Sequence, residues 1–399
     1  MARIRQCVAL IVMSFLVGAT LGAPASAQTV KIGIINTYSG PEAQVGDQLD
    51  KGFRLYYNQH QKDLPSGVKI ELVVRDDTGP NPEVAKRLAQ ELIVRERVAL
   101  LAGLIWSPNA AAIAPLTKEA KLPLVLMNAA GSAIPRISPY LVRTSFTLWQ
   151  QGYPLGKWAA GQGWKTAYTA VSDFIPGHDA EAAFTKGFSE AGGKMLGSVR
   201  FPLANPDFVP FLQRVKDAKP DIVFLFNPGG KQATAIMKAA AEIGLQKAGI
   251  KIISTQDVLP DEELPNIGDS AEGVISAGTY STAGDRPQNS AFLAAWAAAY
   301  GDKSTPDFFS VGGWDGMAAI FDLVKATKGK FNGDQAIEFL KNWKNPDSPR
   351  GPIAIDPATR DIVQNVYIRR TEKKNGKLVN TEIATIPAVK DPWKEFNPQ

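Results

Sequence analysis

The chain has 399 residues, of which 45% are hydrophobic and 21% are charged, and its formal net charge is +5. This length predicts two domains, and the hydrophobic content excludes a disordered chain. Lysine and arginine are interspersed with aspartate and glutamate, without a cluster of cations and aromatic residues. We therefore expect no nucleic-acid partner.

The first 27 residues have the pattern of a secretory signal peptide. Two arginines near the N-terminus precede an apolar run at 8–21, and small residues at 25–27 supply a cleavage site. The run is shorter than the roughly 20 apolar residues that span a membrane. We predict cleavage before Gln28 and a soluble periplasmic product.

The single cysteine of the chain, Cys7, lies within this N-terminal segment. A lipid anchor would require a cysteine at the cleavage site instead. The mature chain is therefore expected to contain no disulfide, no thiolate metal ligand and no cysteine nucleophile.

From residue 30 onward, short apolar runs alternate with segments that carry apolar residues at helical spacing. The strands predicted in the first part of the chain are 30–35, 68–74, 100–102, 124–127 and 141–143. One predicted helix runs from Ser107 to Glu119, with Ser107 as its N-cap and Pro108 in its first position. Strands that alternate with helices favour a parallel sheet covered on both faces.

The same alternation restarts after residue 143. The strands predicted here are 167–171, 194–200, 222–226 and 251–254. The helices predicted around them are 148–160, 180–190, 208–215 and 231–243. Two successive halves of this kind predict an α/β protein with two Rossmann-like lobes and parallel central sheets.

The C-terminal third does not repeat the pattern. Its predicted elements are a strand at 274–277, helices at 291–300, 310–325 and 333–343, and strands at 353–355, 362–369 and 378–386. We expect these segments to complete both lobes, so that several chain crossings form a multi-strand hinge and a closable cleft. The predicted division is a signal peptide at 1–27, a first lobe of 28–144 and 281–347, and a second lobe of 145–280 and 348–399.

Motifs for catalysis are missing from the sequence. It has no phosphate-binding loop, nucleophile elbow, zinc-protease motif or EF-hand loop. His60 and His178 lie far apart, and no activated nucleophile accompanies them. Asp76 and Asp77 precede a helix start, and such a pair needs a third ligand or an apolar pocket for metal or acid–base work. A charged loop is the favoured interpretation, and we expect no enzyme activity, no cofactor and no metal site.

Several short motifs occur in a characteristic order along the chain. They are Ser39-Gly40-Pro41, Gly46-Asp47, Gly52, Asp76-Asp77, Ala129-Ala130-Gly131-Ser132, Ile267-Gly268-Asp269 and Asp315-Gly316. In number, order and spacing they resemble those of the branched-chain amino-acid-binding proteins, which are type I solute-binding proteins of ABC importers. The resemblance extends from about residue 30 to the C-terminus. It implies a two-lobed fold, a monomer, and an inner-membrane ABC permease as the partner.

Ligands of open α/β sheets bind beyond the carboxyl ends of the strands. The loops in that position are 37–44, 103–109 and 128–132 in the first lobe and 172–177, 227–230 and 254–259 in the second. We expect these loops to line the cleft. The predicted ligand-binding residues are Tyr38, Trp106, Ser107, Ala129, Ala130, Gly131, Ser132, Phe174, Asn227, Asp257 and Tyr280.

Two of these positions indicate a ligand with a carboxylate. Ser107 lies at a helix start beside unpaired backbone N–H groups, which favour an anion, and the small residues of 128–132 let backbone amides approach it. A plain helix cap and a tight turn are the alternatives. In the family that the chain resembles, the position of Asp257 holds the α-ammonium of an amino acid. An exposed loop carboxylate is the alternative there.

The aromatic residues leave the ligand class open. Where some members of that family place a tryptophan over the ligand, this chain has Gln44-Val45-Gly46. Tyr38, Trp106, Phe174 and Tyr280 lie in or beside the predicted cleft loops and favour an apolar or aromatic ligand.

We predict a periplasmic receptor that captures a small carboxylate-bearing solute, either an amino acid or an aromatic acid. Hinge closure would enclose the solute, which would then be delivered to a membrane permease. A ligand-sensing subunit of a signalling receptor is the main alternative. An exported α/β enzyme is less favoured.

Overall fold

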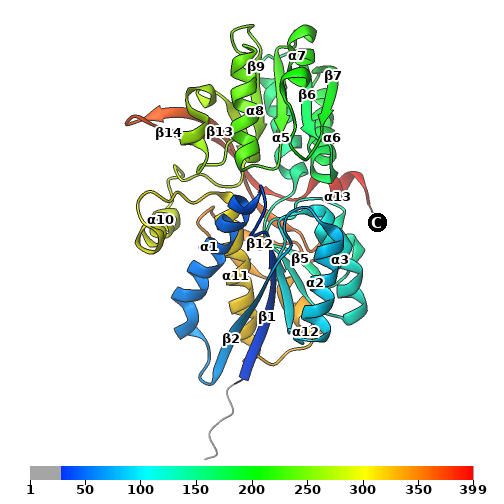
Figure 1. Ribbon diagram of the computed structural model, residues 1–399, viewed down its shortest axis with the longest axis vertical. Coiled ribbons are helices and arrows are strands. Elements are labelled where there is room, and N and C mark those ends of the chain that lie inside the picture. The colour runs from blue at the N-terminus through cyan, green and yellow to red at the C-terminus, as the bar shows by residue number, and fades with distance from the viewer. Residues whose placement is uncertain (1–27, 399) are drawn as a thin grey trace, which may run out of the picture.

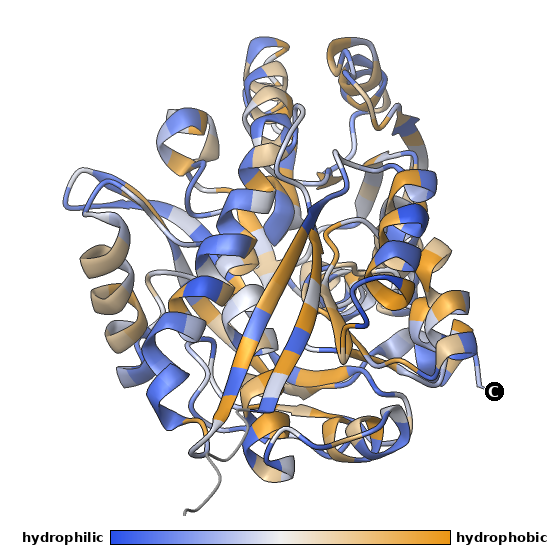
Figure 2. Ribbon diagram, turned by 60° about the horizontal axis from the view of Figure 1, so that its bottom comes forward, coloured by the Kyte–Doolittle hydropathy of each residue, from blue (hydrophilic) through white to orange (hydrophobic). Residues whose placement is uncertain are grey.

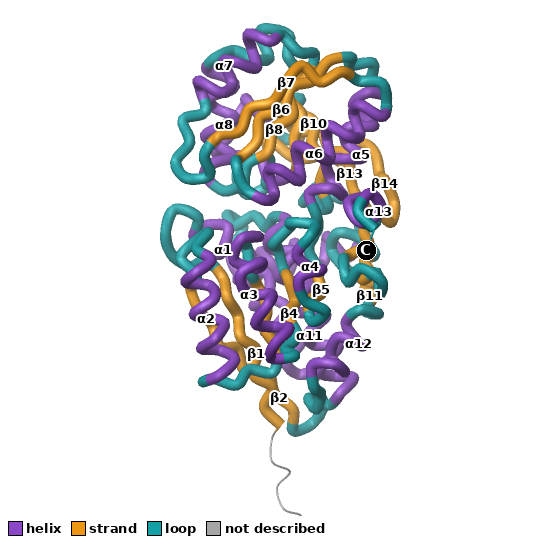
Figure 3. The backbone as a smooth tube through the Cα atoms, turned by 90° about the vertical axis from the view of Figure 1, so that its right-hand side faces the viewer, coloured by secondary structure: helices purple, strands orange, loops and turns teal. Residues whose placement is uncertain are grey.

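The computed structural model describes residues 28–398. The predicted signal peptide and Cys7 lie outside the described residues, so the cleavage position stays a prediction. The described chain forms two lobes, one above the other, and its C-terminus lies beside their junction (Figures 1 and 3).

The first lobe is built on a five-stranded parallel sheet with the order β2-β1-β3-β4-β5. Its strands are β1 (Gln28–Asn36), β2 (Val68–Asp76), β3 (Leu100–Gly103), β4 (Leu124–Leu126) and β5 (Leu141–Arg143). Every residue of β3, β4 and β5 is buried, as expected for a sheet covered on both faces. Hydrophobic residues follow the strands, and hydrophilic residues occupy the outward faces of the helices (Figure 2).

Helices cover both faces of this sheet. On one face lie α2 (Pro82–Val94) and α3 (Ser107–Ala120), and on the other α1 (Ala43–His60) and α11 (Phe308–Thr327). A Cβ on Gly52 of α1 would lie 1.9 Å from the carbonyl oxygen of Ser310 in α11, so this close helix contact requires glycine. The remaining helices on this side of the junction are α4 (Ile134–Ile137), α10 (Pro287–Tyr300) and α12 (Gly333–Leu340).

The second lobe contains a larger, mixed sheet. Its order is β11-β12-β13-β10-β9-β8-β6-β7, and β14 pairs with β13. The strands from β10 to β7 are parallel, whereas β13 is antiparallel to β10, β12 and β14. The strands are β6 (Thr166–Ser172), β7 (Lys194–Phe201), β8 (Ile222–Phe226), β9 (Lys251–Thr255), β10 (Ile275–Gly278), β11 (Lys344–Asn345), β12 (Ile353–Ile355), β13 (Ile362–Lys374) and β14 (Lys377–Val389).

The helices of the second lobe are α5 (Leu148–Gly161), α6 (Ile175–Glu190), α7 (Val209–Ala218), α8 (Lys231–Glu242) and α9 (Leu264–Ile267). The last helix, α13 (Pro392–Phe396), lies at the junction of the lobes (Figure 1). Short helices such as α4, α9 and α13 are too brief to show helical periodicity, which is why the sequence did not predict them.

The chain passes between the lobes between β5 and α5, between β10 and α10, and between α12 and β13. The predicted architecture of two α/β lobes with parallel central sheets and a multi-strand hinge is confirmed. The residue boundaries of the lobes stay a prediction. None of the helices within residues 28–398 combines the length and the apolar character that crossing a membrane requires.

Candidate ligand-binding site between the lobes

A cavity lies between the two lobes, beside the carboxyl ends of strands from both sheets. Its volume is about 20 Å³, so the side chains of the two lobes nearly fill it in this structure. The first lobe contributes Ile105, Trp106, Ser107, Asn128 and Ala130 to its lining. The junction and the second lobe contribute Phe146, Leu148, Phe174, Pro176, Phe226, Pro228 and Asp257.

Ser107 lies at the start of α3 and holds a neighbouring loop. Its Oγ accepts a hydrogen bond of 3.0 Å from the Gly131 N–H. The prediction that Ser107 caps α3 is wrong, because Trp106 is the N-cap residue and Ser107 is already helical. The Ser107 hydroxyl accepts its hydrogen bond from the loop N–H of Gly131 instead of from an N–H of its own helix. The start of α3 nevertheless faces the cavity, and the unpaired N–H groups of a helix start favour an anion.

Aromatic rings form much of the remaining wall. Phe174 stacks on Phe226 with a centroid distance of 6.0 Å and an interplanar angle of 22°. Phe146, from the connection between β5 and α5, contacts Phe308 edge-on at 5.6 Å. Of the lining rings, Phe146, Phe174 and Phe226 come from the junction and the second lobe, while Trp106 comes from the first lobe. Closing the lobes therefore brings aromatic surfaces together around the ligand position.

Asp257 is the ionisable residue of the lining. It follows β9 in a short 3₁₀ turn, Gln256–Val258, and only 5% of it is exposed. Its Oδ2 has no hydrogen-bond partner among the described residues. Burial raises the pKa of this carboxyl to about 7, and the Thr255 side chain, the backbone N–H of Asp257 and the buried guanidinium of Arg369 oppose the shift only in part. An unpaired, buried carboxyl oxygen at a cavity wall is suited to accept a hydrogen bond from a ligand.

Five of the predicted ligand-binding residues line the cavity: Trp106, Ser107, Ala130, Phe174 and Asp257. Ala129, Gly131 and Ser132 lie in the same loop as Ala130 but are not part of the lining. They stabilise the loop that carries Ala130, through the Gly131 hydrogen bond to Ser107 and the contacts of Ser132 described below.

Three further predicted residues also lie outside the lining. The Tyr38 hydroxyl donates a hydrogen bond of 2.6 Å to Asp50 Oδ1. Asn227 is buried, and its Oδ1 accepts a hydrogen bond of 3.1 Å from the Gly229 N–H, which shapes the loop after β8. Tyr280 is fully buried and packs edge-on against a phenylalanine of α10.

Sequence reasoning missed several lining residues. Phe226 ends a strand that was predicted, and Pro228 and Pro176 lie in predicted cleft loops, so their position after a strand was an available signal. Phe146 and Leu148 had no such signal, because they follow a connection whose path depends on how the two lobes pack.

Polar contacts join the lobes around the cavity. The Ser132 N–H of the first lobe donates a hydrogen bond of 2.9 Å to Asp179 Oδ2 of α6. On another side, Gln232 Nε2 of α8 donates a hydrogen bond of 2.9 Å to Glu42 Oε1, next to α1. The structure therefore has its lobes closed on each other.

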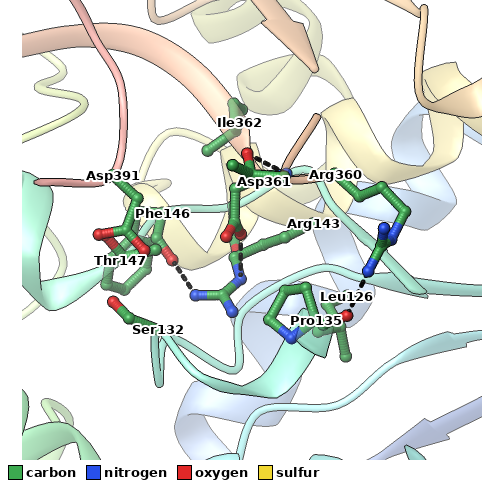
Figure 4. A network of polar contacts seen from close by, with 12 residues as sticks. Leu126, Ser132, Pro135, Arg143, Phe146, Thr147, Arg360, Asp361, Ile362 and Asp391 are labelled. Carbon is green, nitrogen blue, oxygen red and sulfur yellow. Dashed lines mark hydrogen bonds and ion pairs between the residues drawn. The ribbon is translucent and has the colours of Figure 1, made fainter. Parts of the chain in front are cut away.

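A buried guanidinium connects the cavity loop to the hinge (Figure 4). Arg143, at the end of β5, donates from Nη2 to the Gly131 carbonyl oxygen at 2.7 Å and from Nη1 to the Phe146 carbonyl oxygen at 3.3 Å. Its Nε is paired with Asp361 Oδ1 at 3.1 Å, and both side chains are fully buried. One residue thus fixes a cavity loop, a cavity wall and the segment that leads into β13.

The C-terminal helix α13 contributes a second cation to this network. Lys394 Nζ lies 3.0 Å from Asp361 Oδ2 and 3.7 Å from Asp391 Oδ2. It also donates a hydrogen bond to the carbonyl oxygen of Ser132 in the cavity loop. Burial and the nearby Asp361 carboxylate raise the pKa of Asp391 to about 6. The end of the chain therefore contacts the loop that carries part of the cavity wall.

Within residues 28–398, no group of three or more histidine, cysteine, aspartate or glutamate side chains could hold a metal ion.

Comparisons with known proteins agree with this geometry. A family model described as periplasmic binding protein matches residues 29–377. The Leu/Ile/Val-binding protein homolog 6 of Brucella melitensis biotype 1 is 40% identical over 369 residues, covering 92% of this chain and 94% of the relative.

Two crystal structures of solute-binding proteins of ABC transporters are also similar to this chain. One, from Rhodopseudomonas palustris BisB5 in complex with 3,4-dihydroxybenzoic acid, is 48% identical with a TM-score of 0.88, covering 92% of this chain and 99% of the other. The second, from R. palustris in complex with 4-hydroxybenzoate, is 45% identical with a TM-score of 0.87, covering 91% and 98%.

The family expected from the loop motifs is thus confirmed over most of the chain, together with the two-lobed fold. The similar proteins are solute-binding proteins, and the site described above has a cavity between two lobes as its central feature. The chain belongs to the periplasmic binding protein family, whose members bind solutes and are not enzymes.

Proposed function

We propose that this protein is the periplasmic receptor of an ABC importer for a small aromatic carboxylate that carries a ring hydroxyl. The observation that carries the proposal is the lining of the interlobe cavity. Aromatic walls enclose it, a helix start borders it on one lobe, and the buried Asp257 carboxyl borders it on the other. The two R. palustris relatives, whose structures hold hydroxybenzoates, support the same ligand class.

The walls favour a flat ring. Trp106, Phe146, Phe174 and Phe226 provide faces and edges against which an aromatic ring packs favourably.

The carboxylate of the ligand is assigned to the first lobe. The start of α3 supplies N–H groups and the positive end of the helix dipole, which stabilise an anion. Ser107 adds a hydroxyl whose oxygen already accepts the Gly131 N–H, so its proton is free to be donated to the ligand.

The ring hydroxyl is assigned to Asp257. With a pKa of about 7, its carboxyl takes up a proton readily near neutral pH. An anionic ligand in the same closed cavity favours that neutral form further, because two negative charges repel each other in a low dielectric. The unpaired Oδ2 then exchanges a hydrogen bond with the hydroxyl.

A second candidate ligand is an aliphatic amino acid, which the name of the Brucella relative and the presence of Asp257 favour. In that case Asp257 binds the α-ammonium group and must be ionised. The two candidates therefore predict opposite effects of pH on affinity.

The test is titration calorimetry of residues 28–399 with 4-hydroxybenzoate, benzoate and leucine at roughly pH 6 and pH 8. We expect 4-hydroxybenzoate to bind about tenfold or more tightly than benzoate, since one buried hydrogen bond to a charged or polar partner contributes about 1.4 kcal/mol. Its affinity should fall from pH 6 to pH 8. Tight binding of leucine, with an affinity that rises over the same interval, would overturn the aromatic ligand.

Two serine variants test where the carboxylate of the ligand binds. We expect Ser107→Ala to weaken 4-hydroxybenzoate binding about tenfold, because a hydroxyl donor to the carboxylate is lost. Ser290→Ala on α10, an exposed serine remote from the cavity lining, is the matched control and should bind as the parent does. Equal affinities for both variants would place the carboxylate elsewhere.

The receptor acts as a monomer, with residues 28–144 and 281–347 as one lobe and 145–280 and 348–399 as the other. Hinge closure encloses the ligand, and the closed form is presented to an inner-membrane permease. The closed contacts between Ser132 and Asp179 and between Gln232 and Glu42 support this mode of action.

A further inference from the structure

Trp106 separates two spaces. On one side it lines the ligand cavity, and on the other it lines an outer groove between the lobes. The other residues of that groove are Pro41, Glu42, Thr78, Gly79, Pro80, Leu203, Ala204 and Asn205. The groove has a volume of about 350 Å³ and is open to solvent, since most of these residues are partly or fully exposed. The indole ring is therefore the end wall of the ligand cavity.

A chain of buried hydrogen bonds holds this wall in place. Trp106 Nε1–H donates to Thr37 Oγ1 at 2.9 Å. The Thr37 hydroxyl donates in turn to Asp77 Oδ1 at 2.7 Å, and Asn109 Nδ2 donates to Asp77 Oδ2 at 2.9 Å. Thr37, Asp77 and Asn109 are fully buried, and none of them lines the cavity.

The direction of these hydrogen bonds permits one arrangement. An indole N–H can only donate, so the threonine oxygen must accept from Trp106 and use its single proton toward Asp77. Asp77 is in turn fixed by the Gly79 N–H, which donates to Oδ1 at 3.2 Å. Because each member has a partner, the network favours a single rotamer of the indole.

We propose that Thr37 and Asp77 are positioning residues that fix Trp106 as the end wall and so limit the length of the ligand. The inference rests on the proposed function, because it assumes an aromatic carboxylate in the cavity. It gives Asp77 a role for which the sequence favoured only a charged loop. With the wall fixed, we expect the cavity to admit a benzoate and to exclude an acid with an extended chain between ring and carboxylate.

Removing the Thr37 hydroxyl, which accepts the hydrogen bond from Trp106, should let the indole change its orientation. In Thr37→Val, a side chain of similar shape leaves the buried Trp106 N–H without a partner. An unpaired buried donor is unfavourable, so the indole turns toward the solvent of the outer groove, where its N–H is hydrated. The cavity then joins the groove and gains room for a longer ligand.

The experiment compares the affinities of 4-hydroxybenzoate and 4-hydroxycinnamate for the parent chain and three variants. Thr37→Val removes the hydroxyl, whereas Thr37→Ser keeps it. Thr117→Val on α3 is the matched control, because Thr117 is also a fully buried, hydrogen-bonded threonine but lies away from Trp106. The readout is the ratio of the two affinities, which general destabilisation would not change.

We expect Thr37→Val to shift the ratio about tenfold or more toward the cinnamate, and Thr37→Ser and Thr117→Val to keep the parent ratio. An unchanged ratio in Thr37→Val, or an equal shift in Thr117→Val, would overturn the inference. If Thr37→Val does not fold, Thr37→Ala removes the same acceptor and is subject to the same expectation. Absence of any aromatic-acid binding by the parent chain would instead contradict the proposed function.

Discussion

At the scale of single residues, Asp257 shows how burial changes the chemistry of a side chain. Its position after β9 would leave an isolated loop carboxylate hydrated and acidic. In the closed molecule it is 5% exposed with an unpaired Oδ2, and its pKa is raised to about 7. The charge is therefore present or absent according to pH and ligand.

This raised pKa makes the stability of the protein depend on pH. A carboxyl with a higher pKa in the folded than in the unfolded state binds more protons when folded. Its contribution to stability is full below about pH 4, the unfolded pKa, and is lost as pH rises toward about 7.

Asp257→Asn, which resembles the neutral form, should therefore unfold at nearly the parent temperature at about pH 4 and at least about 2 °C above it at about pH 8. Thermal unfolding of the ligand-free protein at both pH values measures the difference. Glu242→Gln, at an exposed carboxylate that ends α8, is the control and should show no such widening. A gap of the same size at both pH values would contradict the burial argument.

At the scale of secondary-structure elements, the short helix α13 contacts both the cavity loop and the hinge. Its Lys394 contacts the carbonyl oxygen of Ser132 and the buried carboxylates of Asp361 and Asp391. Arg143 pairs with the same Asp361 (Figure 4). It also donates a hydrogen bond to the Gly131 carbonyl oxygen. The C-terminal helix thus stabilises the hinge and the cavity loop together.

Removing one cation from this network should lower the free energy of unfolding. Lys394→Met removes the cation that pairs with both buried carboxylates, Asp361 and Asp391, so we expect a loss of about 3 kcal/mol in the free energy of unfolding. Lys390→Met is the control, since its exposed ammonium, 3.2 Å from Asp356, should contribute at most about 1 kcal/mol. Chemical denaturation measures both, and equal losses would show that α13 has no special role.

At the scale of the whole molecule, ligand binding is coupled to the equilibrium between open and closed lobes. Contacts between the lobes, such as the Ser132 N–H to Asp179 bond, stabilise the closed form with or without ligand. Deleting such a contact shifts the population toward the open form and lowers the apparent affinity, although no ligand contact is lost.

Asp179→Ala should therefore weaken ligand binding about five- to tenfold, the equivalent of about 1–1.4 kcal/mol for one hydrogen bond to a carboxyl group. Small-angle scattering of the ligand-free variant should report a larger radius of gyration than the parent has. Glu242→Ala, which removes an exposed carboxylate from the end of α8 in the same lobe, is expected to change neither quantity. A normal affinity for Asp179→Ala would mean that this contact does not govern closure.

The sequence by itself determined the order of strands and helices, because apolar spacing is a local property, and it placed Trp106, Ser107, Ala130, Phe174 and Asp257 beyond the ends of strands. Only the tertiary structure decided which of the loop residues meet. It brought Phe146 and Phe226 to one cavity, buried Asp257, and placed Lys394 against Ser132, 262 residues away in the chain. These outcomes depend on how two lobes and their crossing segments pack, and burial and pairing of that kind leave no periodic trace in the sequence.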